Sequence, residues 1–307
     1  MNLVDGKLLN QIFADQLESS EGREKLAEIG GNYIQQRLRE TSFARQILPP
    51  LNVTIADVTR DEAHDGFVKI IDKEPDSEAM AMNFLGESNA KYIKGDRYKV
   101  SFYRIASDLF SKDETELLAY NYPITKVIEQ NSVKDIQRIE DQGFLSQINT
   151  AITSTGYTSN VTGTGGKLTK TALKTLINLM EGSTVKNGAL KVETLLMPQS
   201  VWNDILEWNV QLLGGDLLGE VTKDGYTYKT LMGRKVVVSI KNDLFLSAGK
   251  PVIYGFAAPQ MLGNFFILNQ TKFVVKKDFN IISFKGWEDI ALGVGNIRGA
   301  CSITLDA

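Results

Sequence analysis

The stretch VTGTGGKLT, residues 161–169, is the part of the sequence that most resembles a catalytic motif. A phosphate-binding loop has the pattern G-x-x-x-x-G-K-[ST] directly after a buried strand, because its amides cradle phosphates and its hydroxyl binds magnesium. When Gly166 and Lys167 are aligned with that pattern, Val161 replaces the first glycine and Leu168 replaces the hydroxyl residue. The preceding segment also has helical spacing. We therefore predict a glycine-rich connector between two helices, with no nucleotide bound.

Other side chains that could do chemistry lack the partners that their chemistry needs. The one histidine, His64, lies in the polar stretch RDEAHDG, and no G-x-S-x-G elbow accompanies it. The one cysteine, Cys301, excludes an intrachain disulfide, and we expect it to be buried in a C-terminal strand. A zinc site would need pairs of Cys and His.

Carboxylates are the remaining candidates for acid–base chemistry. Those considered are expected to be solvated surface charges: Glu116, Glu140, Asp141, Glu288 and Asp289. The sequence therefore predicts no catalytic residue, no cofactor-binding residue and no metal ligand. A chain of this length without such a motif favours a structural role over that of an enzyme.

Composition narrows the class of protein further. The chain has 307 residues with 43% hydrophobic and 23% charged residues, which is typical of a folded protein of two units or of one body with insertions. The net charge of −3 does not resemble that of a basic nucleic-acid binder. No apolar run is long enough to span a membrane, and MNLVDGKLLNQIF lacks the features of a signal peptide. We expect a protein made in a reducing cytoplasm.

Four segments have the apolar periodicity of helices. Residues 4–18 and 23–40 predict two amphipathic helices at the start of the chain. Residues 132–152 predict the longest helix, with Ser132 as its N-cap. Residues 168–182 predict a further helix that ends at a glycine. We expect the long helix to bury one stripe against a sheet of the same subunit: Ile136, Ile139, Phe144 and Ile148.

Strand patterns fill most of the rest of the chain. GFVKIID and RYKVSFYRI flank a polar, glycine-punctuated stretch, so residues 61–104 predict a long two-stranded excursion. An isolated hairpin of that length has too little core to be stable, so a surface outside the monomer should support it. The C-terminal third is rich in strands. Helices and strands mix without a βαβ rhythm, which predicts an α+β fold.

The order of these elements resembles the major capsid protein of tailed bacteriophages, which has the Hong Kong 97 fold. The resemblance covers residues from about 25 to 307 and rests on the order of ETSFARQILPPLNV, the excursion, the long helix, TLLMPQSVWNDIL, LMGRKVVVSIKNDL and PVIYGFAAPQMLGNFFILNQTKFVVKKD. It implies the following domains: an N-terminal arm (1–45), a first part of the peripheral domain (46–60), an extended loop (61–104), the peripheral domain with its spine helix (105–185), an axial domain (186–270) and C-terminal strands of the peripheral domain (271–307).

The resemblance also implies a function and partners. The chain would self-assemble into pentamers and hexamers of an icosahedral phage head that encloses double-stranded DNA, in the virion after assembly in the host bacterial cytoplasm. Portal, scaffold and decoration proteins would be further partners. The net charge of −3 fits DNA held by confinement, because tight phosphate contacts need many basic groups.

The excursion would lie over a neighbouring subunit. Contact residues implied by the resemblance are Met80, Met82, Phe84, Leu85, Lys91, Tyr92, Ile93, Lys94 and Arg97. The basic ones would meet acidic groups such as those of 23–40. Some family members crosslink Lys to Asn between subunits, but nothing in the sequence shows that Lys91 or Lys94 reacts. Two alternatives stay open, an encapsulin-like compartment shell and a hydrolase with an unrecognised site, and the size of the assembled protein distinguishes them.

Overall fold

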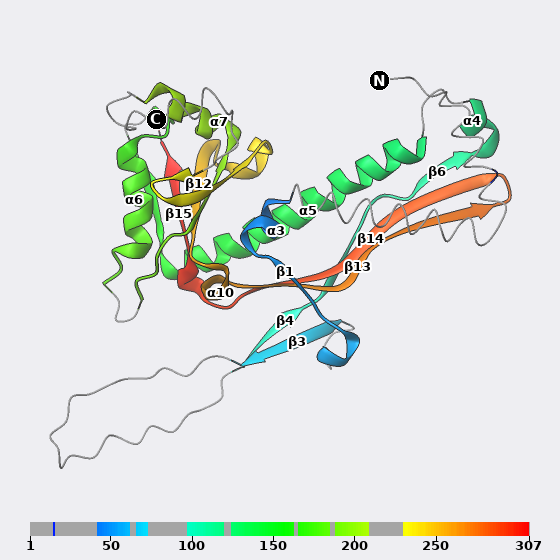
Figure 1. Ribbon diagram of the computed structural model, residues 1–307, viewed down its shortest axis with the longest axis horizontal. Coiled ribbons are helices and arrows are strands. Elements are labelled where there is room, and N and C mark those ends of the chain that lie inside the picture. The colour runs from blue at the N-terminus through cyan, green and yellow to red at the C-terminus, as the bar shows by residue number, and fades with distance from the viewer. Residues whose placement is uncertain are drawn as a thin grey trace, which may run out of the picture.

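The computed structural model describes residues 15, 42–61, 66–72, 97–119, 124–162, 165–184, 188–208 and 230–306. Figure 1 shows two bodies side by side, an elongated one built on a long hairpin and a second one built on a larger sheet. The two helices expected at 4–18 and 23–40 lie outside the described residues, apart from Asp15, and so does His64.

The elongated body is a five-stranded sheet around one antiparallel hairpin. Its strands β13 (Gly263–Asp278) and β14 (Ile281–Val294) pair along most of their length, with register shifts between Ile267 and Lys272. On one side β1 (Pro50–Asn52) pairs in parallel with β13. On the other side β5 (Tyr103–Ala106) and β6 (Phe110–Asp113) pair with β14, and α4 (Glu114–Ala119) follows β6.

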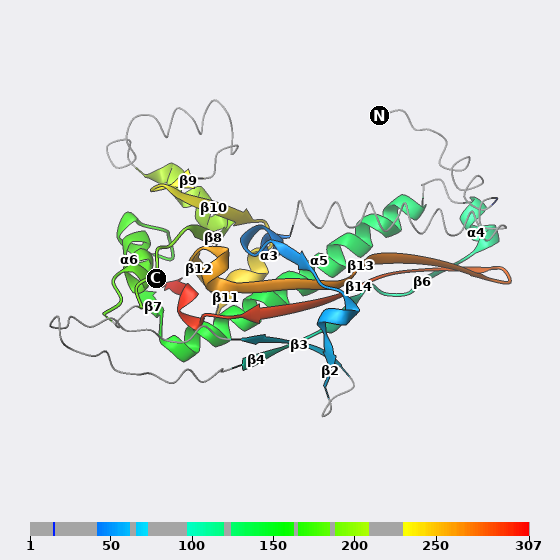
Figure 2. The same cartoon turned by 60° about the horizontal axis from the view of Figure 1, so that its bottom comes forward.

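A single long helix, α5 (Ile124–Thr155), lies along this sheet (Figures 1 and 2). The expected helix at 132–152 is confirmed, but α5 begins directly after Pro123, so Ser132 is a fully buried residue inside it and not its N-cap. The buried apolar stripe comprises Val133, Ile136, Phe144, Leu145, Ile148 and Ile152. The expectation for Ile139 was wrong, because that side chain is 50% exposed.

A small three-stranded sheet forms the root of the excursion. Strand β3 (Phe67–Asp72) pairs with β2 (Thr59–Arg60) and with β4 (Arg97–Ser101), so the expected two-stranded base is present. Val100 on β4 packs into a cluster with Val53, Phe266 and Ala291 of the elongated body. A side chain at Gly293 on β14 would meet Val100 at 2.6 Å, so this glycine allows the close approach.

The second body is a seven-stranded mixed sheet. Its main order is β7 (Thr158–Val161), β15 (Ala300–Leu305), β12 (Lys250–Phe256), β8 (Thr194–Pro198), β10 (Arg234–Ser239) and β9 (Thr230–Leu231), and β11 (Leu246–Ser247) pairs with β12. Two pairs are parallel, β8 with β10 and β7 with β15, and the others are antiparallel.

Helices complete the second body and the junction between the bodies. They are α6 (Lys170–Glu181), α7 (Gln199–Asn203), η2 (Asp204–Glu207), η4 (Asn242–Phe245), α10 (Pro259–Leu262) and η5 (Ile297–Gly299), while α3 (Phe43–Ile47) and η1 (Ile55–Asp57) flank β1. The apolar stripe of α6 is buried as expected, and Gly182 ends the helix with an ordinary backbone φ of −88°.

The core between α6 and the seven-stranded sheet is apolar. It contains Leu173, Leu176, Ile253, Ile303 and Cys301. Cys301 is fully buried in β15, as its sequence context predicts, and burial raises the pKa of its thiol to about 12. Such a thiol is a packing residue, because the reactive form is the thiolate.

Each of the two sheets takes strands from more than one of the expected domain ranges. Strand β15 hydrogen-bonds to β12 and β7 in the seven-stranded sheet, so the range 271–307 is shared between the bodies. Strand β13 begins at Gly263 and belongs to the elongated body, although 186–270 was expected to be one domain. Residues 158–181, expected with the spine helix, pack on the seven-stranded sheet.

Candidate functional site: a buried ionic network and the root of the excursion

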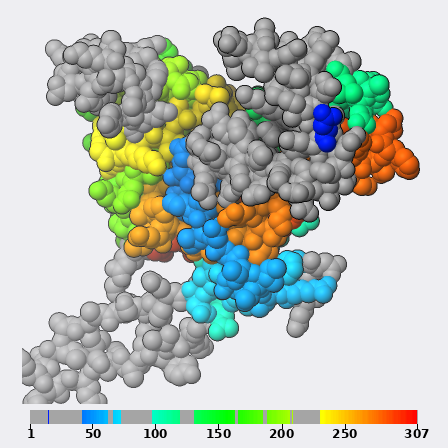
Figure 3. Space-filling model, turned by 45° about the vertical axis from the view of Figure 1, so that its right-hand side comes forward, coloured from blue at the N-terminus to red at the C-terminus, as the bar shows by residue number. Residues whose placement is uncertain are grey.

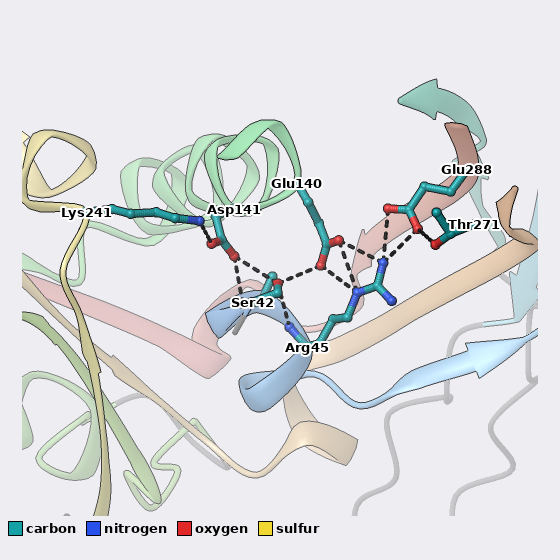
Figure 4. A network of polar contacts seen from close by, with 8 residues as sticks. Ser42, Arg45, Glu140, Asp141, Lys241, Thr271 and Glu288 are labelled. Atoms are coloured by element: carbon teal, nitrogen blue, oxygen red, sulfur yellow. Dashed lines mark hydrogen bonds and ion pairs between the residues drawn. The ribbon is translucent and has the colours of Figure 1, made fainter. Parts of the chain in front are cut away.

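The network begins at the N-terminus of α3, where Ser42 is the N-cap. Its hydroxyl accepts a hydrogen bond from the backbone N–H of Arg45 at 3.4 Å. The same hydroxyl lies 2.7 Å from Glu140 Oε1 and 3.0 Å from Asp141 Oδ1 (Figure 4). A hydroxyl carries one proton, so it cannot donate fully to both carboxylates. Ser42 therefore shares its one proton between the two carboxyl groups.

Arg45 joins two carboxylates from distant parts of the chain. Its Nε lies 3.0 and 3.1 Å from the two oxygens of Glu140, and its terminal nitrogen reaches Glu140 Oε2 at 2.9 Å. The same terminal nitrogen lies 3.0 and 2.9 Å from the oxygens of Glu288 on β14. Thr271 on β13 donates to Glu288 at 3.0 Å. The guanidinium also lies 5.6 Å from the centre of the Phe265 ring, so both charge and stacking hold it.

Asp141 forms the second half of the network. Its Oδ2 accepts from Lys241 Nζ at 2.6 Å, and its Oδ1 accepts from the backbone N–H of Ala44 at 3.1 Å. Lys241 stands between β10 and η4, so this ion pair links α5 to the chain that leaves the seven-stranded sheet. Figure 4 shows the two halves meeting at Ser42.

Burial and an imbalance of charge set the protonation of the network. The side chains of Glu140, Asp141 and Glu288 are 0% exposed and face two cations, Arg45 and Lys241. Burial raises the pKa of Asp141 to about 6, although Lys241 acts to lower it. Burial also raises the pKa of Glu288 against the effect of Arg45.

The pKa values of Arg45 and Tyr103 are shifted by the same electrostatic environment. Burial opposes the charged form of Arg45, but the charges of Glu140 and Glu288 outweigh it, so the pKa of Arg45 is raised. Burial and those two carboxylates raise the pKa of Tyr103 on β5 to about 12. Each effect has the sign expected for a negative, poorly hydrated site.

The expectation of solvated charges was therefore wrong for four of the five carboxylates. Glu140, Asp141 and Glu288 are fully buried, and Asp289 is 7% exposed and pairs with Arg104 at 2.7 Å. Burial opposes ionisation of Asp289, but hydrogen bonds from Arg104 and Asn269 outweigh it and lower its pKa. Only Glu116, whose side chain is 65% exposed, has a surface position; it pairs with Lys112.

The sequence contained a signal that some of these carboxylates are buried. Glu140 continues the four-residue spacing of Ile136, Phe144 and Ile148, so it lies on the buried face of α5. Following that spacing also places Ile139 off the face, where the structure has it. Glu288 and Asp289 likewise interrupt a strand whose neighbours are almost all buried. Charged residues at apolar positions of an amphipathic pattern indicate buried pairs.

The network is suited to holding elements together rather than to acting on a ligand. It joins α3, α5, β13, β14 and the segment after β10, and its carboxylates are closed to solvent. Aromatic rings surround it, with Phe43 5.6 Å from Phe245 and 6.2 Å from Phe144. Ser42 to Arg45, expected in an N-terminal arm, are therefore fixed within the body. Within the described residues no group of three or more His, Cys, Asp or Glu has the geometry of a metal site.

An open hollow of about 680 Å³ lies elsewhere, along the C-terminal half of α5. It is lined by Gln142, Leu145, Ser146, Asn149, Thr150, Thr153, Ser154, Asp243 and Leu244. Thr150, Thr153 and Ser154 donate their hydroxyls to carbonyls of the preceding turn of α5. These donors are therefore already used by the helix.

The expected inter-subunit residues fall almost entirely outside the described part of the chain. Arg97 is the exception and is the first residue of β4. Its Nε bonds Asp72 Oδ1 at 2.7 Å across the hairpin, and both side chains are more than 60% exposed. The ion pair closes the root of the excursion at the last pair of residues in register, Asp72 and Arg97. The other eight, Met80, Met82, Phe84, Leu85, Lys91, Tyr92, Ile93 and Lys94, lie between these two residues.

The glycine-rich stretch is built into the second body. It is preceded by β7, so the expected helix-to-helix connector contains a strand. The backbone N–H of Gly166 donates to the carbonyl of Asp306 at 3.3 Å, and that of Leu168 donates to the carboxylate of Asp204 at 2.8 Å. Thr169 caps α6. These amides already have acceptors in the chain.

Comparison with solved structures identifies the fold. The capsid of the Myoviridae phage XM1 matches with a TM-score of 0.54 and 14% identity, over 85% of this chain and 90% of that chain. The capsid structure of cyanophage P-SCSP1u gives 0.60 and 12%, over 87% and 88%. The capsid of the native GTA particle gives 0.52 and 12%, over 86% and 89%. The α+β, Hong Kong 97-like capsid fold expected from the sequence is confirmed.

Other comparisons add no relative. No protein-family model matches the chain, and no curated protein matches its sequence. At 10–14% identity the solved structures establish the fold of the chain and not its partners. None of the described helices is long and apolar enough to cross a membrane.

Proposed function

We propose that the chain is a structural capsid subunit that associates with copies of itself to form a closed shell. The observation that carries the proposal is the likeness to capsid chains over 85–87% of this chain and about nine-tenths of theirs. A match over most of both chains supports a role for this chain as a capsid subunit. In this proposal the role is structural and not enzymatic. The buried ion pairs support it, because Arg45, Glu140 and Glu288 bind one another and are closed to a substrate.

The finer form of the proposal is a phage head. Copies would form pentamers and hexamers that enclose double-stranded DNA, within a virion assembled in the host bacterial cytoplasm. A net charge of −3 supports retention of DNA by confinement, because tight phosphate binding would make the wall basic. Portal, scaffold and decoration proteins are further partners in this proposal.

The domain names follow the sheets. The seven-stranded sheet with α6 would form the axial domain around the centres of the pentamers and hexamers. The β13–β14 hairpin with α5 would form the peripheral domain. The 61–104 excursion would be the extended loop. The arm would then end before Ser42, where the chain enters the network.

Imaging and sedimentation of the purified chain test the proposal. A capsid subunit yields shells or defined rings, whereas a small uniform oligomer would contradict it and revive the hydrolase alternative. Shells recovered from cells are then assayed for DNA by their absorbance ratio and nuclease protection. Protected DNA supports a phage head. Shells that hold protein cargo and no DNA would favour an encapsulin-like compartment.

The excursion is proposed to be the clasp between subunits. Val100 attaches its root to the body, and the Asp72–Arg97 pair closes the root across the hairpin, so the segment can be shortened without disturbing the sheet. Residues 73–96 are replaced by an Asp-Gly turn, which leaves Asp72 and Arg97 paired. The shortened chain should melt cooperatively near the wild-type temperature and fail to form shells.

Point variants separate the contact residues from the length of the loop. Lys91→Ala with Lys94→Ala, and separately Phe84→Ala with Tyr92→Ala, should each weaken assembly at unchanged thermal stability. Arg97→Ala should weaken assembly less than these double variants, because Arg97 already pairs with Asp72 in its own subunit. Normal shells from the shortened chain would refute the clasp. Unfolding of that chain would assign the excursion to the subunit core.

A further inference from the structure

The far end of the β13–β14 hairpin presents one aromatic side chain to solvent. Phe279 is the first residue of the two-residue turn between Asp278 and Ile281, and its side chain is 94% exposed. Its backbone φ is +54°, in the left-handed region. Bulky residues rarely occupy that region, and tight hairpin turns normally place Gly, Asn or Asp there. A large apolar residue in a strained and exposed position contributes little to its own subunit.

The turn is held in place from behind. The carbonyl of Asn280 accepts from the backbone N–H of Glu114 at 2.8 Å, and its side-chain amide donates to Asp113 at 2.5 Å. Lys277 bonds Glu114 at 2.8 Å. The start of α4 therefore braces the turn, and Phe279 projects from a rigid support. Rigid support reduces the entropy lost when an exposed side chain becomes buried in an interface.

The charges around the turn are paired within the subunit. Lys276 bonds Asp278 at 3.2 Å, and Lys277 bonds Glu114. Ile281, which is 46% exposed, adds apolar surface beside Phe279. If this end of the hairpin is buried against an apolar surface, each charge of these two pairs keeps its partner within the subunit. Figure 3 shows the orange end of the hairpin projecting at the edge of the molecule.

The small size of this contact indicates the kind of partner. A buried aromatic side chain covers about 150–250 Å². Stable complexes between free proteins bury about 1,200 Å² or more. The contact is therefore useful where other surfaces already hold the neighbour in place, as between the many identical copies of a closed assembly.

We propose that Phe279 is an assembly anchor, whose ring inserts into an apolar surface of a second copy of this chain. The inference rests on the proposed shell function and adds to it a specific contact at the end of the hairpin. A central aromatic residue in an interface typically dominates its binding energy.

Phe279→Gly tests the anchor, because glycine adopts a positive φ without strain. The variant should melt at the wild-type temperature or higher, while its critical concentration for assembly should rise about tenfold or more. Phe279→Leu should retain most of the assembly. Ala248→Gly is the matched control, since Ala248 has φ +49° in the exposed turn of another hairpin. It should relieve backbone strain equally and assemble normally.

A photo-crosslinking residue at position 279 provides the second measurement and should join two copies of the chain in the assembled state. If the wild-type chain assembles and Phe279→Gly assembles at the same concentration, the anchor proposal is overturned and the shell function stands. The same holds if the wild-type chain assembles and the residue at position 279 forms no crosslinks between copies. A lower melting temperature of Phe279→Gly would also overturn it, because the ring would then support its own subunit. A wild-type chain that stays small at every concentration would overturn both proposals.

Discussion

The two cores of the molecule are held together by different interactions. Between α6 and the seven-stranded sheet the contacts are apolar, from Leu173 to Ile303. Between α5 and the five-stranded sheet an apolar stripe surrounds Arg45, Glu140 and Glu288. Apolar packing accepts many arrangements of similar volume, whereas a buried ion pair is satisfied in one geometry. We infer that the ionic core fixes where α3 meets α5 and β14.

Removal of the central cation should have the largest effect on stability. Arg45→Met leaves Glu140 and Glu288 buried without their shared partner, which should cost about 3–5 kcal/mol of unfolding free energy. Urea denaturation at pH 7 measures it. Arg104→Met is the control, because the side chain of Arg104 is 59% exposed and its pair with Asp289 should contribute no more than about 1 kcal/mol. Equal losses in the two variants would contradict a special role for the buried charges.

The apolar core should respond to truncation in another way. Leu176→Ala empties a fully buried site beside Cys301 and should cost about 2–5 kcal/mol, from lost transfer energy and the cavity left behind. No titratable group drives this loss, so it should be the same at pH 5 and pH 7. The loss from Arg45→Met should shrink at pH 5, because burial raises the pKa of Glu288 and this carboxyl group accepts a proton more readily there. Urea denaturation at the two pH values measures the loss of unfolding free energy in each variant. A pH-dependent loss in Leu176→Ala would contradict the distinction between the two cores.

Periodicity predicted the apolar core better than the ionic core. The stripe of α6 and most of the buried face of α5 follow from spacing, and the burial of Cys301 follows from its residue type in a C-terminal strand. The partners of the carboxylates do not, because Arg45 and Glu288 stand 243 positions apart and only the fold brings them together. The same limit applies to β15, whose pairing with β12 and β7 depends on the return of the chain from the long hairpin.

Titration of Asp141 should change the unfolding free energy by a smaller amount. Its pKa is raised by burial from 3.8 to about 6, so the folded protein binds this proton more tightly than the unfolded chain. An acid of this kind contributes stability that is fully present below its unfolded pKa and is lost as the pH rises through its folded pKa. The unfolding free energy should therefore fall between pH 5 and pH 7, by roughly 1–2 kcal/mol.

Asp141→Asn should remove most of that slope, because asparagine keeps an acceptor for Ala44 and cannot ionise. Urea denaturation at pH 5, 6 and 7 measures the slope. Glu116→Gln, which changes an exposed carboxylate, should leave it intact. A slope that persists in Asp141→Asn would show that another group of the network, such as Glu288 with its raised pKa, takes up the proton.

The smallest expected effect is at the glycine-rich stretch, where no binding should be measurable. Isothermal titration with ATP or GTP tests the site. A phosphate would need free backbone amides, but Gly166 donates to Asp306 and Leu168 donates to Asp204. Asp204 also places a carboxylate where the negative charge of a phosphate would have to lie. Asp204→Asn lowers that repulsion while keeping an acceptor for Leu168, so it is the most permissive variant to titrate.

If the wild-type chain binds the nucleotide and Lys167→Ala does not, the stretch is a nucleotide site and the second body becomes a candidate for catalysis. If neither the wild-type chain nor Asp204→Asn releases or absorbs heat on titration with nucleotide, the stretch is only the structural start of α6.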